Sequence, residues 1–163
     1  MAHFSGTYVQ NFDQKGRVSV PAPFRVALRA GCERLSTASD GPVAIPLVLR
    51  PSDKAACIEG WTESGFNGLL AELEKLDQLS AEYDALATVL YGDAYPMETD
   101  KEGRIIVPDA LLAGAGISRG ENVAFLGLGS RFQLWEPEAV AAQKAAALAV
   151  NAARLALRKA AVP

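Results

Sequence analysis

Hydrophobic and polar positions follow the same order in two separate stretches of the chain. In the first, β-branched and aromatic residues mix with polar ones over residues 7–12, which predicts a half-buried strand. Polar turn residues 13–16, a short strand over 17–20 and a helix over 22–30 follow, and Gly31 ends that helix. The second stretch predicts the same succession: strand 94–99, turn 100–103, strand 104–107 and helix 109–113, which Gly114 ends.

The two stretches share a sequence motif. Asp13-Gln14-Lys15-Gly16-Arg17-Val18-Ser19-Val20-Pro21 recurs 87 positions later as Asp100-Lys101-Glu102-Gly103-Arg104-Ile105-Ile106-Val107-Pro108. In each copy the aspartate is suited to accept hydrogen bonds from turn amides, the glycine tolerates a positive φ, and the proline ends the strand. The repeat therefore predicts two copies of one supersecondary unit, each with an arginine immediately after its turn.

Other segments complete each copy or lie beside it. A strand over 43–49 is expected at a sheet edge or a bulge, because Pro46 has no amide proton to donate. Strands 122–128 and 131–135 are expected to pair as a hairpin across Gly129-Ser130. The predicted units are a first copy over 5–53, a connecting amphipathic helical region over 54–92, a second copy over 93–140 and a C-terminal helix over 141–163.

Two longer helices are predicted outside the repeated motif. Apolar residues recur at three- and four-residue steps over 66–90 with an acidic opposite face, so this stripe serves the core or a subunit interface. The second helix starts after Pro137 and runs to about Lys159. It is rich in alanine, which gives strong helix propensity and a thin apolar stripe. Because alanine lets helices approach closely, we expect the two helices to pack together.

Charge is unevenly distributed along the chain. The formal net charge is −3, which by itself does not indicate a nucleic-acid binder. Residues 12–34 nevertheless carry five basic and two acidic residues, for a local charge of +3, whereas residues 63–84 carry one lysine and six acidic residues, for −5. Exposed charges more than about 10 Å apart are screened at ordinary salt, so an acidic chain can still present a basic face.

The arginines after the turns are the main candidate functional residues. Arg17 and Arg104 either form structural ion pairs with Asp13 and Asp100 or contact phosphates and base edges, for which a planar guanidinium is well suited. We favour DNA contact for Arg17, whereas Glu102 weakens that case for Arg104. The predicted DNA-binding set is Lys15, Arg17, Arg25, Arg29, Lys101 and Arg104, and the predicted structural turn residues are Asp13, Gly16, Asp100 and Gly103.

The sequence offers little evidence for a metal site, a catalytic site or a membrane span. The cysteines, Cys32 and Cys57, are far apart in the sequence and His3 is the only histidine, so neither a metal site, a cofactor nor a nucleophile–histidine pair is expected. Asp13 and Asp100 could form a catalytic carboxylate pair, but turn capping is the preferred interpretation and no enzyme is predicted. No apolar run is long enough for a membrane span and no secretory signal begins the chain, so we expect a cytoplasmic, nucleoid-associated protein.

The tandem motif resembles the MraZ family of bacterial transcription regulators, within the AbrB-like (SpoVT-AbrB) superfamily. The residues that carry the resemblance are Phe4-x-Gly6, Asp13-x-Lys15-Gly16-Arg17-x-Ser19-Val20-Pro21-Ala22-x-Phe24-Arg25, Asp100-x-x-Gly103-Arg104-Ile105-x-Val107-Pro108 and Phe132-x-Leu134-Trp135. The resemblance implies an α+β fold in which tandem swapped-hairpin β units form one pseudo-dimeric β-barrel domain. It also implies that the two long helices pack together on one side.

The resemblance also implies a function. Family members form ring-shaped homo-oligomers that bind double-stranded DNA at short direct repeats upstream of the division and cell-wall gene cluster, usually as repressors. The family's basic residues correspond here to Lys15, Arg17, Arg25 and Arg104. The chain departs from the family at Leu111-Leu112, where members usually have Leu-Arg, so the second copy is expected to contribute less to DNA and more to packing.

Two other functions compete with this one. An antitoxin-like member of the same superfamily would need an acidic, disordered tail to wrap a toxin, whereas this tail is predicted to be helical and ends with basic residues. A structural ring protein without a DNA ligand is the second alternative.

Overall fold

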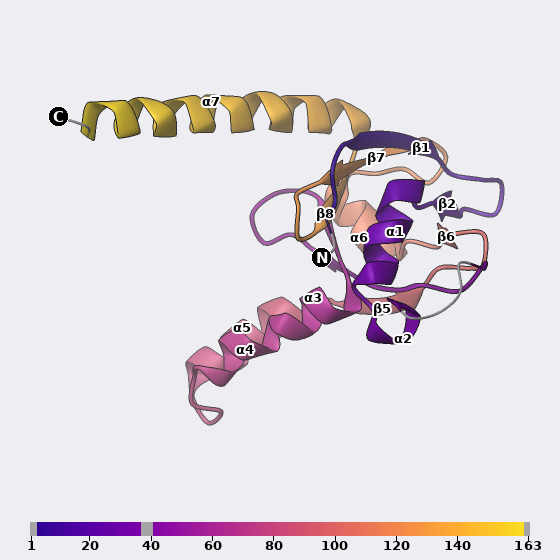
Figure 1. Ribbon diagram of the computed structural model, residues 1–163, viewed down its shortest axis with the longest axis horizontal. Coiled ribbons are helices and arrows are strands. Elements are labelled where there is room, and N and C mark those ends of the chain that lie inside the picture. Colours follow the sequence, from indigo (N-terminus) through magenta and orange to yellow (C-terminus); the bar gives the residue numbers. More distant parts are fainter. Residues whose placement is uncertain (1–2, 37–40, 162–163) are drawn as a thin grey trace.

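The computed structural model describes residues 3–36 and 41–161, and Figure 1 shows a β-rich body from which two helical segments project. The strands are β1 (Thr7–Asn11), β2 (Val18–Ser19), β3 (Pro46–Pro51), β4 (Ile58–Trp61), β5 (Tyr95–Glu98), β6 (Arg104–Ile105), β7 (Asn122–Gly127) and β8 (Phe132–Trp135). The helices are α1 (Ala22–Ala30), α2 (Glu33–Ser36), α3 (Glu63–Gly68), α4 (Leu70–Glu74), α5 (Ala81–Tyr91), α6 (Asp109–Ala115) and α7 (Pro137–Ala161). The fold is α+β.

Three of the strand pairings join the two copies of the repeat. The main sheet is antiparallel, with the order β1-β7-β8-β4-β3-β5. In it β1 of the first copy pairs with β7 of the second, and β5 of the second copy pairs with β3 of the first. β2 and β6 form a separate two-stranded ribbon, again with one strand from each copy.

The sheet is open, so the expectation of a closed barrel is wrong. β1 and β5 lie at opposite ends of the strand order, and no pairing between them joins the two edges. The strand that contains Pro46 was expected at an edge or a bulge, and β3 is not an edge strand, because it lies between β4 and β5. Pro46 is the first residue of β3, a position where a strand tolerates a residue without an amide proton. β4 was not predicted from the sequence.

The hydrophobic core lies between the main sheet, the ribbon and the short helices α1 and α6. Both helices contact β3, and Phe24 of α1 is fully buried among the rings of Phe4, Phe125 and Phe132. Helix α6 continues through Gly114, where the sequence predicted its end, and stops at Gly116. That glycine has a φ of 66°, a left-handed conformation that favours glycine at a helix end.

The single helix predicted over 66–90 is three helices, α3, α4 and α5, which together project from the body as an arm (residues 63–91; Figure 1). The helical path breaks after α4. Ser80 caps α5 by accepting a hydrogen bond from the Tyr83 amide, and Asp77 accepts one from the Leu79 amide in the preceding turn. These polar side chains satisfy backbone donors outside a helix, which explains why the leucine spacing does not continue as one rod.

Helix α7 does not pack against the arm, contrary to the expectation from its alanine content. Figure 1 shows α7 leaving the body above the sheet while the arm leaves below it. The buried contact of α7 is at its root, where Val140 joins Cys57, Ala124 and Trp135 in a small apolar cluster. Alanine gives the rest of α7 enough intrinsic helix propensity to be regular, but too little apolar surface to draw it onto the arm.

A buried ion pair joins the arm to the sheet. Arg50 on β3 and Glu59 on β4 lie 2.7 Å apart, and each side chain is only 5% exposed. The second terminal nitrogen of Arg50 donates to the carbonyl of Val89 in α5, and the Trp61 indole N–H donates to Glu59. The guanidinium therefore holds α5 in place only while Glu59 keeps it neutralised.

We predict that Glu59→Gln lowers the free energy of unfolding by about 3–5 kcal/mol, because it leaves the buried charge of Arg50 uncompensated. Urea unfolding at one fixed protein concentration measures the loss. Glu63→Gln is the matched control, because its partner Arg34 is exposed and such pairs contribute about 1 kcal/mol or less. Equal losses in the two variants would contradict the prediction.

Candidate nucleic-acid interface

The turn of the first copy is held by one carboxylate. Asp13 Oδ1 accepts hydrogen bonds from the amides of Lys15 and Arg17 at 2.9 and 2.8 Å, and Oδ2 accepts one from Arg17 Nε at 2.7 Å. Gly16 has a φ of 79°, a value that a residue with a Cβ rarely adopts. The aspartate thus closes the turn and orients the arginine that follows it.

The second copy repeats this geometry. Asp100 accepts from the amides of Glu102 and Arg104 at 3.0 and 2.8 Å and from Arg104 Nε at 2.7 Å, and Gly103 has a φ of 83°. Each carboxylate is therefore bonded to its own turn and its own arginine. The structure does not bring Asp13 and Asp100 together as a hydrogen-bonded carboxylate pair.

Hydrogen bonds keep both turn carboxylates ionised. The backbone amide of Arg17 lowers the pKa of Asp13 below its usual value, and the Arg17 side chain lowers it further. Burial raises the pKa of Asp100, but the hydrogen bonds from Arg104 outweigh burial and the net shift is also downward. The bond to Asp100 in turn raises the pKa of Arg104. Both carboxylates are therefore ionised at neutral pH.

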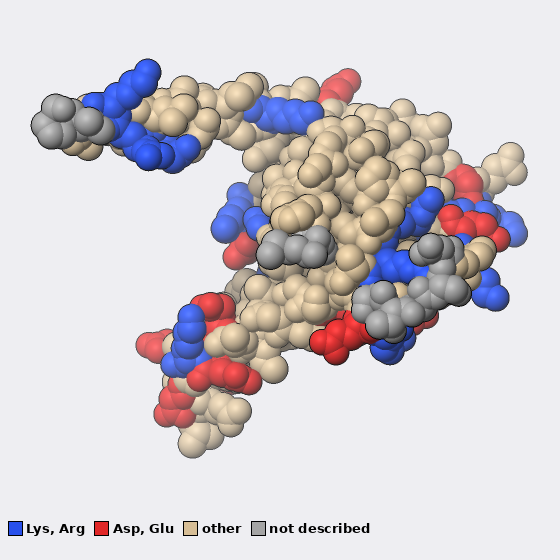
Figure 2. All heavy atoms as spheres, in the orientation of Figure 1, with Lys and Arg blue, Asp and Glu red and all other residues tan. Residues whose placement is uncertain are grey.

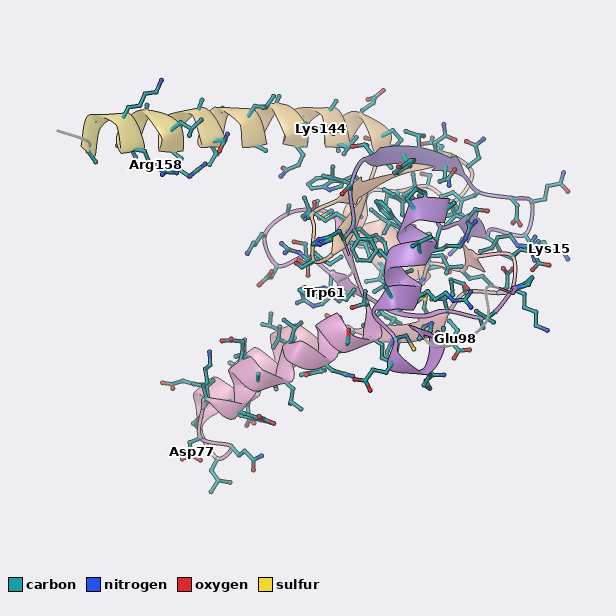
Figure 3. All side chains as sticks on the ribbon, in the orientation of Figure 1. Lys15, Trp61, Asp77, Glu98, Lys144 and Arg158 are labelled. Carbon is teal, nitrogen blue, oxygen red and sulfur yellow. The ribbon has the colours of Figure 1, made fainter. Side chains whose placement is uncertain are left out.

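The ribbon places these arginines at the surface. β2 and β6 pair with Val18 opposite Ile105 and Ser19 opposite Arg104. Side chains alternate along a strand, so the burial of the valines and isoleucine at 18, 20, 105 and 107 turns positions 17, 19, 104 and 106 outward. The Arg17 and Arg104 side chains are 26% and 30% exposed, and the label in Figure 3 places Lys15 at the tip of the first turn.

The two arginines differ in their surroundings. Arg17 Nε donates to Asp13, and its two terminal nitrogens have no acceptor among the described residues. Arg104 uses Nε in the same way, but its Nη2 also donates to Glu102 at 3.3 Å. The first turn carries Lys15 at the position that Glu102 occupies in the second, so the positive charge is greater at the Arg17 end of the ribbon.

The remaining predicted cations lie beside the ribbon. Arg25, Arg29 and Lys101 line one open cavity of about 370 Å³, together with Glu102. Arg29 donates to the carbonyl of Gly41 at 3.2 Å from an exposed position. Figure 2 shows basic side chains on this flank of the body, interspersed with acidic ones. The structure thus brings the six predicted cations to one region, in two groups.

Arg25 is held more firmly than the sequence suggested. Its Nη1 donates to the carbonyl of Val20 at 2.6 Å. Its side chain also lies against Gly103, where an added Cβ would overlap Arg25 Cδ. This arginine of the first copy therefore covers the turn of the second copy and leaves no space there for a larger residue.

Arg119 mirrors Arg25, and the sequence analysis missed it. Its Nη2 donates to the carbonyl of Val107, the repeat equivalent of Val20, at 2.6 Å, and its Nη1 donates to the carbonyl of Gly16 at 2.7 Å. An added Cβ on Gly16 would lie 2.6 Å from Arg119 Cδ. The repeat spacing points instead to Leu112, which is buried, so no motif signal could have identified Arg119.

Comparison with known proteins identifies the family. The family model described as "MraZ protein, putative antitoxin-like" matches residues 90–159. The chain is 46% identical over 147 residues to the transcriptional regulator MraZ of Gluconobacter oxydans, covering 90% of this chain and 84% of that one. The corresponding protein of Gluconacetobacter diazotrophicus is also 46% identical, over 90% and 87%, and that of Xanthobacter autotrophicus is 36% identical, over 90% and 85%.

The chain belongs to the MraZ family. The curated MraZ relatives carry the name of transcriptional regulators, which is not an enzyme class. Across residues 3–36 and 41–161, no three side chains of His, Cys, Asp or Glu gather as metal ligands would. Cys32 and Cys57 are both buried, and burial raises the pKa of Cys57 to about 11, so this thiol is protonated at neutral pH.

No helix in the described part of this MraZ-family chain combines the length and the apolar character that crossing a membrane requires.

We predict that Arg119→Met lowers the free energy of unfolding of this MraZ-family chain by roughly 1.5–3 kcal/mol, the usual range for hydrogen bonds that involve a charged group. The variant loses the bonds to Gly16 and Val107 and the ion pair with Asp109. Arg34→Met is the control, because its exposed guanidinium pairs with Glu63 at the surface, and we expect a change of about 1 kcal/mol or less. Urea denaturation measures the free energy of unfolding of both variants. An unchanged value in Arg119→Met would contradict the stabilising role of the Arg119 hydrogen bonds.

Proposed function

We propose that this protein is a sequence-specific DNA-binding transcriptional repressor that acts in the cytoplasm at the nucleoid. Its target is a set of short direct repeats in its own promoter, upstream of the division and cell-wall gene cluster. The observation that carries the proposal is the β2–β6 ribbon, which presents Arg17 and Arg104 to solvent in charged, oriented form. The names of the curated relatives and the tandem motif support it.

The ribbon suits the major groove of DNA. That groove admits a two-stranded β-ribbon, and an arginine with free terminal nitrogens can bond both major-groove acceptors of guanine. Arg17 has such nitrogens, so we assign it to base readout, and we assign exposed Lys15 to the neighbouring phosphate. Arg104 contributes less because Glu102 shares its guanidinium. Arg25, Arg29 and Lys101 add positive charge beside the ribbon.

We further propose that the two copies form one pseudo-dimeric domain of swapped hairpins. The units are 5–53 and 93–140, joined by 54–92 and followed by 141–163, of which residues 162–163 lie outside the described part. The exchange of β1 and β5 between copies supports this organisation. So do the reciprocal contacts of Arg25 and Arg119.

We predict that Arg17→Ala weakens operator binding by about tenfold or more, since one bidentate arginine–guanine pair contributes roughly 1–3 kcal/mol of discrimination. Fluorescence anisotropy at fixed salt, with promoter DNA and a scrambled duplex, measures both affinities. Arg17→Lys keeps the charge but not the planar fork, so it should lose preference for the promoter while keeping affinity for the scrambled duplex.

The control is Arg34→Ala, whose guanidinium pairs with Glu63 at the base of the arm, away from the ribbon. Unchanged promoter affinity in Arg17→Ala would remove this residue from the interface. Failure of the unaltered protein to bind promoter DNA at any salt would favour a structural ring protein instead.

We propose that the projecting helices assemble the protein into a homo-oligomeric ring. The arm carries six acidic residues and one lysine, whereas α7 carries four basic residues and Glu138. Figure 2 shows the acidic side chains toward the outer end of the arm and basic ones at the far end of α7. Leu148, Val150 and Leu157 of α7 are also largely exposed.

These two surfaces complement each other but diverge within one chain, as the labels of Asp77 and Arg158 in Figure 3 illustrate. We therefore assign their contact to neighbouring copies, with α7 of one copy against the arm of the next. Such a head-to-tail contact closes into a ring when the rotation allows it. A ring places several ribbons on successive DNA repeats, so weak individual contacts give a tight complex by raising the local concentration.

We predict that Arg154→Glu combined with Arg158→Glu reduces the oligomer to smaller species, because it places like charges at the contact. Sedimentation velocity measures the mass. The pair Glu72→Lys and Glu74→Lys on the arm should restore the oligomer in the quadruple variant, whereas Lys15→Glu, a charge reversal on the ribbon, should leave the mass unchanged. An undiminished mass in the α7 double variant would refute this assignment.

The description of the family model also contains the words "putative antitoxin-like". An antitoxin is therefore the second candidate function. In this chain the C-terminal segment is the regular helix α7 through Ala161, with basic residues in its last turn. Stable co-purification of a small toxin that protects α7 from proteolysis would establish that function in place of the proposed ring contact.

A further inference from the structure

The two strands of the ribbon present different residues at equivalent outward positions. Along β2 and its turn these are Lys15, Arg17 and Ser19, and along β6 and its turn they are Glu102, Arg104 and Ile106. Ile106 is 61% exposed, while Ile105 and Val107 on either side of it are buried. Of these six outward side chains, the isoleucine is the only apolar one.

The register of the ribbon places Ile106 next to Arg17. Ser19 lies opposite Arg104, and the same antiparallel register puts Arg17 opposite Ile106. Directly opposite residues have Cβ atoms about 4.5–5.5 Å apart. One end of the ribbon thus combines Lys15, Arg17 and Ile106, whereas the other combines Glu102, Arg104 and Ser19.

Ile106 has no structural task that explains its exposure. The buried residues of the same ribbon, Val18, Val20, Ile105 and Val107, belong to the hydrophobic core, and Ile106 does not. On a DNA-facing ribbon the chemistry that an isoleucine recognises is the 5-methyl group of thymine, the one apolar group on the base edges of the major groove. A phosphate would not attract it.

We infer that Ile106 is a specificity-determining residue that contacts a thymine methyl beside the base read by Arg17. This inference rests on the proposed DNA-binding function and deepens it. One end of the ribbon then reads a guanine and a thymine methyl together, with Lys15 on the adjacent phosphate. The other end offers a partly neutralised arginine and a serine, which has no comparable apolar group.

This difference gives each protomer a direction on DNA. A domain with exact two-fold symmetry would prefer a palindromic site, because both halves would read the same bases. Here the backbones of the two copies are related by an approximate two-fold axis, but their outward side chains differ in type. The preferred site of one protomer is therefore asymmetric, and protomers that follow one another in the same orientation match direct repeats.

Replacement of thymine by deoxyuridine tests the inference, because it removes the methyl group and leaves base pairing intact. Each thymine position is replaced in every repeat of the promoter fragment, and affinity for the full-length protein is measured by anisotropy at fixed salt. We expect one position at which deoxyuridine weakens binding about fourfold per contacted repeat, the factor for burying one methyl group.

Variants assign that methyl group to its residue. In Ile106→Ser the deoxyuridine penalty at this position should disappear while sensitivity to the neighbouring guanine remains, the signature of a direct pair in a double-mutant cycle. Ser19→Ile should create a new penalty at the symmetry-related position. Val9→Ser, which changes an exposed valine on β1, should leave the deoxyuridine profile as it is in the unaltered protein.

The outcomes separate this inference from the function on which it rests. Promoter binding that depends on Arg17 but not on any thymine methyl would overturn the role of Ile106 alone. So would a penalty that persists in Ile106→Ser, or a change in oligomer mass in that variant, which would make Ile106 a contact between copies. No binding to promoter DNA in the unaltered protein would overturn both.

Discussion

Neither copy of the repeated unit can complete its own sheet, and the rest of the structure depends on this constraint. β1 finds its partner in β7 and β5 finds its partner in β3, so each copy satisfies backbone hydrogen bonds that the other would leave open. Arg25 and Arg119 add a second, reciprocal connection, since each bonds to its own copy and covers the turn of the other. The ribbon that carries the candidate DNA contacts exists only because both copies are in place.

The arginines of this protein divide into structural and outward-facing groups. Arg25 and Arg119 direct their terminal nitrogens to backbone carbonyls, and Arg50 neutralises a buried glutamate and holds a carbonyl of α5. Arg17 uses only Nε within the described fold. The same side chain type therefore fixes the shape of the ribbon in one place and leaves donors available to a ligand in another. The number of occupied terminal nitrogens distinguishes the two groups, whereas exposure does not, because the Arg119 side chain is 30% exposed and that of Arg17 is 26% exposed.

The projecting helices show how charge and packing can act at different levels of organisation. Within the chain, the arm is fixed by a buried ion pair and α7 by a small apolar cluster at its root. Beyond those roots, the arm is mainly acidic and the far end of α7 is basic, and these two charged regions diverge within the chain. Surface ion pairs contribute little individually, so such helices add affinity between copies mainly when several charges and apolar side chains act together.

Local chemistry made part of this protein predictable from its sequence. Asp13 and Gly16, and again Asp100 and Gly103, specify turns through hydrogen bonds between residues two to four positions apart, and alternation specifies which ribbon residues face the core. The order of the strands, the open sheet, the break in the arm and the separation of α7 from it were decided only by the tertiary structure. The pairing of Arg119 with Gly16 joins residues 103 positions apart, and it depends on where packing places the end of α6. Interactions within a turn are set by neighbours in the chain. The exchange of strands and the contacts of Arg25 and Arg119 depend instead on the free energy of packing two distant copies together.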